Sequence, residues 1–333
     1  MKPHDDTHQP QGDSRAERFT ARSLRGILLP ATTPFDASGL VDARALSHNI
    51  KRWNETGISG YVILGSTGER VHLDERESQD VIRTARECVP RSRAFVVGVG
   101  QQGTRASVAE ARRAAAEGAD AVLVITPNFY RGAMTPDAVA AHYETIADAS
   151  TVPVVLYNIP QNTGLALSPE TIARLSAHEN IIGIKDSSGD MVNFLEMLRL
   201  QSENFAVLTG HASLLYAALS GGAQGAILAA ACVAPEVAVR IARLVEQGEH
   251  AQARELQRCF TPLARAVTTR FGIGGLKHAL DISGYAGGEV RAPLTQPDEA
   301  AQREIAKVLE ECRLSQQETV SETKLQAEGA VTT

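Results

Sequence analysis

The pattern that determines the fold, an apolar run that ends in polar residues, is clearest in Ile181-Ile182-Gly183-Ile184-Lys185-Asp186-Ser187-Ser188-Gly189-Asp190. It opens as a short apolar run, which is typical of a parallel strand buried on both faces. Lys185 ends the run, and burial disfavours the ammonium form of a lysine. A neutral amine condenses with ketones, so we expect Lys185 to form a Schiff base with a 2-oxo acid. The alternative is an exposed strand end at which Lys185 only aids solubility.

The same pattern recurs along the chain. Eight Val-, Ile- and Leu-rich runs are each followed by a helical or turn-rich segment, at spacings of about 30 residues. Eight such units predict an α/β fold, a closed (β/α)8 TIM barrel rather than an open sheet. The expected strands are residues 24–29, 60–64, 94–99, 121–126, 152–157, 181–185, 205–209 and 225–229.

The barrel is expected to be one domain with additions at both ends. Residues 1–22 form a polar N-terminal arm, residues 23–232 the barrel, and residues 233–313 a C-terminal helical extension of the same domain. Gly248 and a turn at residues 272–275 are expected to separate the added helices. Residues 314–333 are polar and are expected to be a disordered tail.

Composition excludes several classes of function. The 333 residues carry a formal net charge of −6 with dispersed basic residues, so no nucleic-acid footprint is expected. No apolar run reaches membrane-spanning length, and the first residues resemble neither a secretory signal nor a transit peptide. Four widely spaced cysteines predict reduced thiols in a cytoplasmic protein. The nine histidines show no HxH or HExxH pattern, so no metal site is expected.

A barrel places its chemistry at the C-terminal ends of its strands. Polar or small residues stand at most of these ends, far apart in sequence but expected to meet around the barrel mouth. This geometry favours a functional over a solubilising role for Lys185. The residues are Thr32, Thr33, Ser66, Thr67, Tyr130, Tyr157, Lys185, Ser187 and Gly210.

Each of these motifs also has a plainer interpretation. The Gly65-Ser66-Thr67-Gly68-Glu69 stretch is suited to hold a carboxylate, but it could be only a turn with a helix cap. Tyr157 could be a packed core tyrosine and Tyr130 a loop residue. Asp186 and Asp190 lack a third metal ligand, and Asp186 is interpreted as a hydrogen-bonding residue at the strand end.

The stretch Gly98-Val99-Gly100-Gln101-Gln102-Gly103 matches the dinucleotide-binding pattern GxGxxG. The acidic residue expected at the end of the next strand is missing, and the motif lies in the third unit instead of the first. Glycines that permit a tight strand-to-helix turn explain it better than a nicotinamide site.

Taken together, these motifs resemble the dihydrodipicolinate synthase and N-acetylneuraminate lyase superfamily over about residues 24–293. The resemblance rests on the turn at residues 65–69, Leu156-Tyr157-Asn158-Ile159-Pro160 with Thr163-Gly164, and Ile182-Gly183-Ile184-Lys185-Asp186. Residues 126–132, 185–190, 266–277 and 291–294 look most like 4-hydroxy-2-oxoglutarate aldolase.

The resemblance implies a role for each matching residue. Lys185 matches the Schiff-base lysine, and Tyr157 matches the tyrosine that carries protons to and from the substrate. Ser66 and Thr67 match the pair that holds the carboxylate and relays protons. Tyr130 matches a tyrosine that reaches into a neighbouring subunit's site, within a homotetramer built as a dimer of dimers. Further substrate-binding positions are implied at Ser187, Gly210, Ile227 and Asn162.

The resemblance implies a class I aldolase that cleaves 4-hydroxy-2-oxoglutarate to pyruvate and glyoxylate. No cofactor is expected, since the imine replaces the Lewis acid of a metal-dependent aldolase. The alternatives are a dehydratase or aldolase of a 3-deoxy-2-oxo sugar acid, dihydrodipicolinate synthase, and a non-catalytic 2-oxo-acid-binding protein. Synthases of this superfamily carry an arginine where Asn162 stands, which weakens the synthase interpretation. Three positions also depart from the related 4-hydroxy-2-oxoglutarate aldolases. Phe129 stands where they usually have tyrosine, Gly274 where they often have proline, and Thr67 where asparagine is common.

Overall fold

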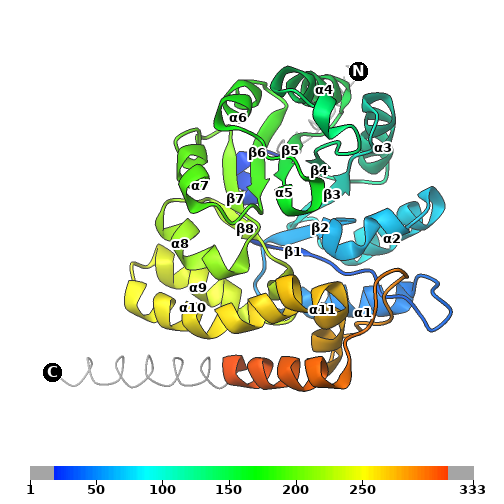
Figure 1. Ribbon diagram of the computed structural model, residues 1–333, viewed down its shortest axis with the longest axis vertical. Helices are drawn as coiled ribbons and strands as arrows, with labels where there is room; N and C mark the ends of the chain where they lie inside the picture. Colours follow the sequence, from blue (N-terminus) through cyan, green and yellow to red (C-terminus); the bar gives the residue numbers. More distant parts are fainter. Residues whose placement is uncertain (1–18, 314–333) are drawn as a thin grey trace, which may run out of the picture.

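The computed structural model describes residues 19–313, and its centre is a closed barrel of eight parallel strands (Figure 1). The strands follow one another in chain order, and β8 closes the barrel by pairing with β1. The fold class expected from the sequence is therefore confirmed. The strands are β1 (Gly26–Pro30), β2 (Gly60–Ile63), β3 (Ala94–Val99), β4 (Ala121–Ile125), β5 (Val154–Asn158), β6 (Ile181–Asp186), β7 (Ala206–Thr209) and β8 (Gly225–Ile227).

Helices surround the barrel and connect consecutive strands. Several begin with the residues that capping chemistry favours: Asp42, Asp74, Thr135, Ser168 and Asp190 each accept a hydrogen bond from a first-turn N–H group. The connecting helices are α1 (Ala43–Trp53), α2 (Glu75–Cys88), α3 (Thr104–Ala116), α4 (Pro136–Ala149), α5 (Pro160–Thr163), α6 (Pro169–Ser176), α7 (Met191–Leu198) and α8 (Leu215–Ser220).

Three labelled helices follow the barrel and lie together beside it: α9 (Pro235–Glu246), α10 (His250–Arg265) and α11 (Gly272–Ile282) (Figure 1). A further helix covers residues 299–313. The sequence predicted a turn at residues 272–275, but these residues form the first turn of α11. The break lies just before them, in the π-helical turn Ala266–Arg270, and Gly272 takes a left-handed conformation where α11 begins.

The described residues cover the other predicted boundaries only in part. The predicted arm over residues 1–22 lies mostly outside the described residues, and its end belongs to η1 (Ala21–Leu24), where Ala21 and Leu24 are buried. The predicted tail over residues 314–333 lies outside the described residues. We therefore treat the exact division of the chain as a prediction.

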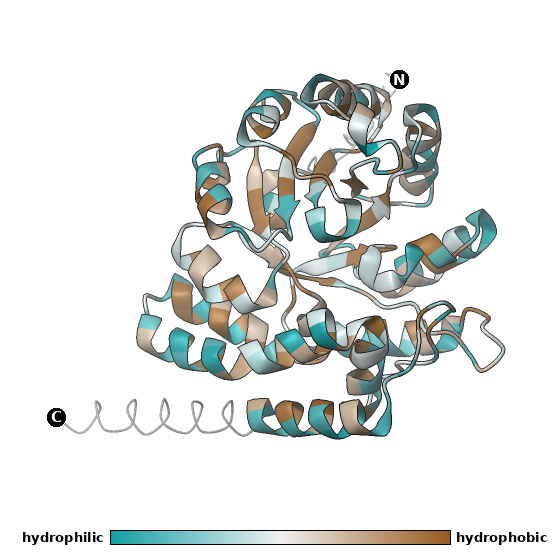
Figure 2. Ribbon diagram, viewed as in Figure 1, coloured by the Kyte–Doolittle hydropathy of each residue, from teal (hydrophilic) through white to brown (hydrophobic). Residues whose placement is uncertain are grey.

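The core has two layers, one inside the barrel and one between the strands and the helices. Inner residues such as Leu28, Val62, Leu123 and Leu208 pack together with Leu24 from η1. The outer layer joins alternate strand residues to the apolar faces of the helices, whose outward faces are more hydrophilic (Figure 2). Burial of alternate residues in opposite layers is what a closed parallel barrel requires.

Strand β6 contains an irregularity that turns Lys185 inward. Val154 pairs with Ile181 and Val155 with Gly183, so Ile182 is an extra residue, as in a β-bulge. Side chains alternate along a strand, and one extra residue reverses every later side chain. Ile184 consequently packs in the outer layer, and Lys185 faces the barrel interior.

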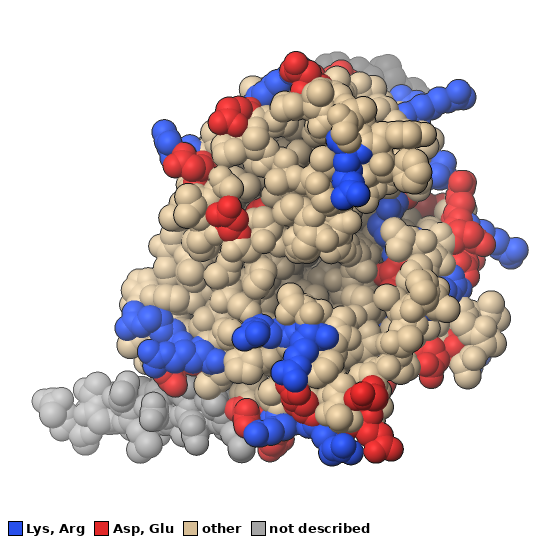
Figure 3. Space-filling model, in the orientation of Figure 1, with Lys and Arg blue, Asp and Glu red and all other residues tan. Residues whose placement is uncertain are grey.

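The surface of the described chain agrees with the dispersed charge of the sequence. On the face in Figure 3, acidic and basic side chains both lie around the margin, and the middle is mostly uncharged. None of the helices in residues 19–313 is long and apolar enough to cross a membrane. Over the same range no cluster of three or more His, Cys, Asp or Glu side chains could hold a metal ion. The four cysteines are unpaired.

Candidate active site

A pocket of about 580 Å³ lies at the C-terminal ends of the strands and gathers most of the predicted site residues. Its walls come from β5, β6, β8, the turn after β2 and the π-helical turn before α11. Among the lining residues are Ser66, Thr67, Tyr157, Asn162, Lys185, Ser187, Gly210 and Ile227. Every residue to which the resemblance assigns a role, except Tyr130, therefore lines one cavity. Thr32 and Thr33, which the barrel pattern also placed at the mouth, are not among its lining residues.

Lys185 and Tyr157 form the centre of this pocket. They are register partners on neighbouring strands, so their side chains leave the sheet side by side. The Lys185 Nζ lies 4.3 Å from the centroid of the Tyr157 ring. Lys185 is only 5% exposed, so it is not the solvated strand-end lysine of the plainer interpretation.

Polar groups beside Lys185 are hydrogen-bonded to one another at the end of β6. The Asn158 Nδ2 group donates a hydrogen bond of 2.6 Å to Asp186, and the Ser188 hydroxyl donates one of 2.8 Å to its other oxygen. Burial raises the pKa of Asp186, and these two hydrogen bonds oppose that shift. Asp186 is thus the strand-end hydrogen-bonding residue that the sequence predicted.

The turn after β2 carries Ser66 and Thr67 in a strained backbone. Leu64 and Glu69, with φ values of 58° and 54°, are the only non-glycine residues with positive φ among residues 19–313, and they flank this turn. Such conformations cost about 1–3 kcal/mol each and persist where the surrounding structure enforces them. Strain on both sides of two hydroxyl residues at a pocket wall indicates a functional turn.

Gly210 makes room for Lys185. A Cβ atom on Gly210 would lie 2.0 Å from the Ser187 Oγ and 2.9 Å from the Lys185 Cε. A larger residue would therefore displace the side chain that carries the amine.

Tyr130 lies apart from the pocket. It is 70% exposed, and its ring contacts Phe129 edge-on at a centroid distance of 5.0 Å. A role for Tyr130 in catalysis consequently requires a second copy of the chain.

Comparison with known proteins agrees with this geometry. Residues 23–312 match the dihydrodipicolinate synthetase family. The chain belongs to this family. Among its relatives, 4-hydroxy-tetrahydrodipicolinate synthase of Methanothrix thermoacetophila is 35% identical over 288 residues, covering 85% of this chain and 96% of the relative. The synthase of Hyphomonas neptunium is 36% identical over 284 residues, with coverages of 85% and 96%.

Solved structures of the dihydrodipicolinate synthetase family share the fold. YagE of Escherichia coli K12, solved in complex with pyruvate, has a TM-score of 0.82 and 28% identity, covering 87% of this chain and 99% of YagE. The 4-hydroxy-tetrahydrodipicolinate synthase of Methylacidiphilum fumariolicum has a TM-score of 0.84 and 26% identity, covering 89% and 98%.

Family membership fixes the general chemistry. The chain is a lyase of the class I aldolase type, which acts on a small pyruvate-type keto acid through a Schiff base. The finer resemblance to 4-hydroxy-2-oxoglutarate aldolase is not supported by these relatives, which are named as synthases.

The pocket around Lys185 also contains residues that the sequence analysis did not single out. His211 follows Gly210 and lines the pocket, and burial lowers its pKa. Its Nδ1 atom is buried without a hydrogen-bond partner. Thr268 and Thr269 enter from the π-helical turn Ala266–Arg270, a helix distortion that often occurs at functional sites. The aldolase-like motif at residues 266–277 was the available signal for both threonines.

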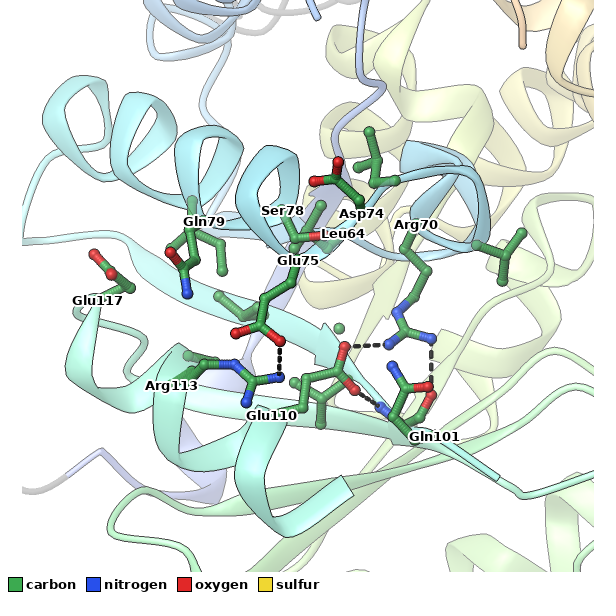
Figure 4. Close-up of a pocket in the computed structure, with 18 of the residues that line it drawn as sticks. Leu64, Arg70, Asp74, Glu75, Ser78, Gln79, Gln101, Glu110, Arg113 and Glu117 are labelled. Atoms are coloured by element: carbon green, nitrogen blue, oxygen red, sulfur yellow. Dashed lines mark hydrogen bonds and ion pairs between the residues drawn. The ribbon is translucent and has the colours of Figure 1, made fainter. Parts of the chain in front are cut away.

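The GxGxxG stretch has a structural role in this family fold. A Cβ on Gly98 would lie 2.3 Å from the carbonyl oxygen of Leu64, so this glycine admits the strained residue before the turn. The Gly100 carbonyl accepts a 2.9 Å hydrogen bond from Arg70, which also pairs with Glu110 (Figure 4). The motif therefore supports the Ser66–Thr67 turn from outside the pocket, which agrees with the tight-turn interpretation.

Proposed function

We propose that Lys185 is the Schiff-base residue and that pyruvate is the keto acid to which it becomes joined. The observation that carries the proposal is the position of the Lys185 amine, buried over Tyr157 in a pocket that also contains Ser66 and Thr67. The hydroxyl and N–H groups of the Ser66–Thr67 turn would bind the carboxylate of pyruvate. This arrangement places the ketone beside the amine.

The proposed reaction begins when the Lys185 amine attacks C2 of pyruvate and water leaves, which forms an iminium ion. Loss of a proton from C3 then gives an enamine, and C3 attacks the carbon of an aldehyde. Tyr157 donates a proton to the aldehyde oxygen as the C–C bond forms, and the same steps in reverse cleave that bond. Hydrolysis, or attack by an amine of the product, releases Lys185. Positioned proton transfer of this kind contributes about 10²–10⁴-fold to the rate.

The relatives favour aspartate semialdehyde as the aldehyde. Seven relatives with 31–36% identity, each with at least 90% of its length matched, are named 4-hydroxy-tetrahydrodipicolinate synthase. We therefore propose condensation of pyruvate with aspartate semialdehyde as the first candidate activity.

Cleavage of 4-hydroxy-2-oxoglutarate to pyruvate and glyoxylate is the second candidate. It is kept because one observation weakens the first candidate: Asn162 lines the pocket where related synthases carry an arginine. Among the described residues that line the pocket, Lys185 is the only lysine or arginine. The carboxylate of aspartate semialdehyde therefore lacks the bidentate partner that a guanidinium would supply.

Assays of two products separate the candidates. The purified chain is given pyruvate with aspartate semialdehyde in one assay and 4-hydroxy-2-oxoglutarate in another, while condensation product and released glyoxylate are measured. Condensation without cleavage supports the synthase, and the reverse supports the aldolase. Turnover of only a 3-deoxy-2-oxo sugar acid supports the remaining catalytic alternative. Saturable pyruvate binding without turnover of any of these substrates supports a non-catalytic binding protein.

We further propose a homotetramer, built as a dimer of dimers, in which Tyr130 enters a neighbouring subunit's pocket. The exposed Phe129–Tyr130 pair supports this proposal, since adjacent large aromatic side chains in water mark a contact surface. Sedimentation of the wild-type chain and of Tyr130→Asp tests it: the variant should lose both assembly and turnover.

A further inference from the structure

We propose that Lys277 and Glu69 are positioning residues, whose buried ion pair holds the Ser66–Thr67 turn in the orientation that binds the substrate carboxylate. This inference deepens the proposed function and rests on it. Lys277 lies on α11, outside the barrel, and belongs to a sequence motif that no step of the proposed reaction uses.

The pair is almost completely enclosed. The Lys277 Nζ lies 2.6 Å from a Glu69 oxygen, and the two side chains are 0% and 1% exposed. The same ammonium group donates a 2.5 Å hydrogen bond to the Glu289 carbonyl and lies 4.4 Å from the centroid of the Phe35 ring. Burial lowers the pKa of Lys277, whereas Glu69 favours the charged form. The buried Lys277 ammonium group would be unfavourable without the Glu69 carboxylate.

The second carboxylate oxygen of Glu69 also has polar partners. This oxygen accepts a 3.1 Å hydrogen bond from the Arg291 backbone N–H and lies 3.1 Å from the His72 Nδ1. The Arg291 guanidinium in turn pairs with Glu77 and lies 4.3 Å from the centroid of the Phe35 ring. The carboxylate of Glu69 is therefore fixed by α11 and by the segment that follows it.

The strained backbone connects this pair to the pocket. Glu69 has a left-handed conformation, and its N–H group donates a hydrogen bond to the Ser66 carbonyl. The preceding Gly68 carbonyl accepts a 2.8 Å hydrogen bond from the Thr33 hydroxyl. Without the contact to Lys277, the backbone of Glu69 can relax to an ordinary conformation and the turn can rotate. This rotation would change the direction in which the hydroxyl and N–H groups of Ser66 and Thr67 point into the pocket.

The test removes both charges together, because removal of one alone leaves the other buried and unpaired. The variant is Lys277→Met with Glu69→Gln in the full chain. Its matched control is Arg86→Met with Asp120→Asn, a pair 3.8 Å apart in which Arg86 also lies over a phenylalanine ring. Pyruvate is the probe, and borohydride-trapped imine is measured against pyruvate concentration.

We expect the half-saturating pyruvate concentration to rise about 10-fold or more in the Lys277/Glu69 variant, since small misplacements of binding groups are costly. The amount trapped at saturation should stay the same, and the control should match the wild type. Lys277→Arg keeps the ion pair, so its half-saturating pyruvate concentration should lie between those of the control and the double variant. If the double variant does not fold, Lys277→Arg alone is the test, and its half-saturating pyruvate concentration should still lie above that of the control.

If the folded Lys277/Glu69 variant has the same half-saturating pyruvate concentration as the wild type, the inference is overturned and the proposed function is left intact. An equal rise in the control variant also overturns it, since the effect would then reflect general destabilisation. Absence of any trapped imine in the wild type overturns the proposed function, and this inference with it.

Discussion

Lys185 and Tyr157 are register partners on β6 and β5, and the Lys185 Nζ lies 4.3 Å from the centroid of the Tyr157 ring. The amine therefore lies against an aromatic face, and the tyrosine shares its pocket. A proton carrier beside an imine is what bond formation or cleavage at the neighbouring carbon requires.

The first prediction concerns the Tyr157 hydroxyl. Tyr157→Phe keeps the ring beside Lys185 but removes the proton carrier, so turnover should fall about 10²–10⁴-fold. Imine formation with pyruvate, measured by borohydride trapping, should change much less. Equal losses in both measurements would indicate that another group carries the proton.

The second prediction concerns Gly210. Gly210→Ala places a Cβ atom 2.9 Å from the Lys185 Cε and closer still to the Ser187 Oγ. Displacement of the amine should slow imine formation about 100-fold. Gly103→Ala is the control, because a Cβ there has no neighbouring atom within 4 Å. A trapping rate that is the same in both variants would contradict this account of Gly210.

The third prediction concerns the choice of aldehyde. Asn162→Arg introduces a bidentate partner for a carboxylate into the pocket wall, whereas Asn162→Gln does not. We expect kcat/KM for aspartate semialdehyde to rise at least about 10-fold in the arginine variant only, from a charged hydrogen bond worth about 1.5–3 kcal/mol. An equal rise in the glutamine variant would show that a guanidinium is not what the aldehyde needs, and no rise in either variant would show that position 162 does not contact the aldehyde.

The fourth prediction concerns acid stability. Burial lowers the pKa of His142 to about 4, while an unfolded histidine titrates near 6.5. The unfolded state therefore takes up the proton first, and stability falls as the pH drops from about 6.5 to 4, by at most about 3 kcal/mol. His142→Gln should lose less stability over this range, as measured by urea unfolding at pH 7 and pH 4.5. His178→Gln, which changes a histidine paired with exposed Asp148, should follow the wild type.

The barrel was predictable because its signal is repeated. Eight apolar runs with intervening helical patterns give one consistent answer even when single boundaries are displaced by a few residues, as at β5 and β8. The pocket was predictable in outline for a related reason. The ends of parallel strands must meet at one mouth, so Ser66, Tyr157 and Lys185 could be brought together without knowledge of any contact.

Two features could not be predicted, because each depends on tertiary structure. The extra residue at Ile182 decides that Lys185 faces inward, and a run of isoleucines does not reveal a bulge. The ion pair between Glu69 and Lys277 joins residues more than 200 positions apart, and each separately reads as an ordinary surface charge. His211 was missed because a single histidine after a strand carries no pattern.

Peptide mapping after reduction of the purified chain with borohydride in the presence of pyruvate tests the central claim most directly. Lys277 serves as an internal comparison, because it is even more deeply buried than Lys185 but is paired with Glu69. We predict a single pyruvate adduct on Lys185, absent from Lys185→Ala together with all turnover. An adduct on Lys277 or another lysine, no adduct at all, or turnover that survives in Lys185→Ala would contradict the account.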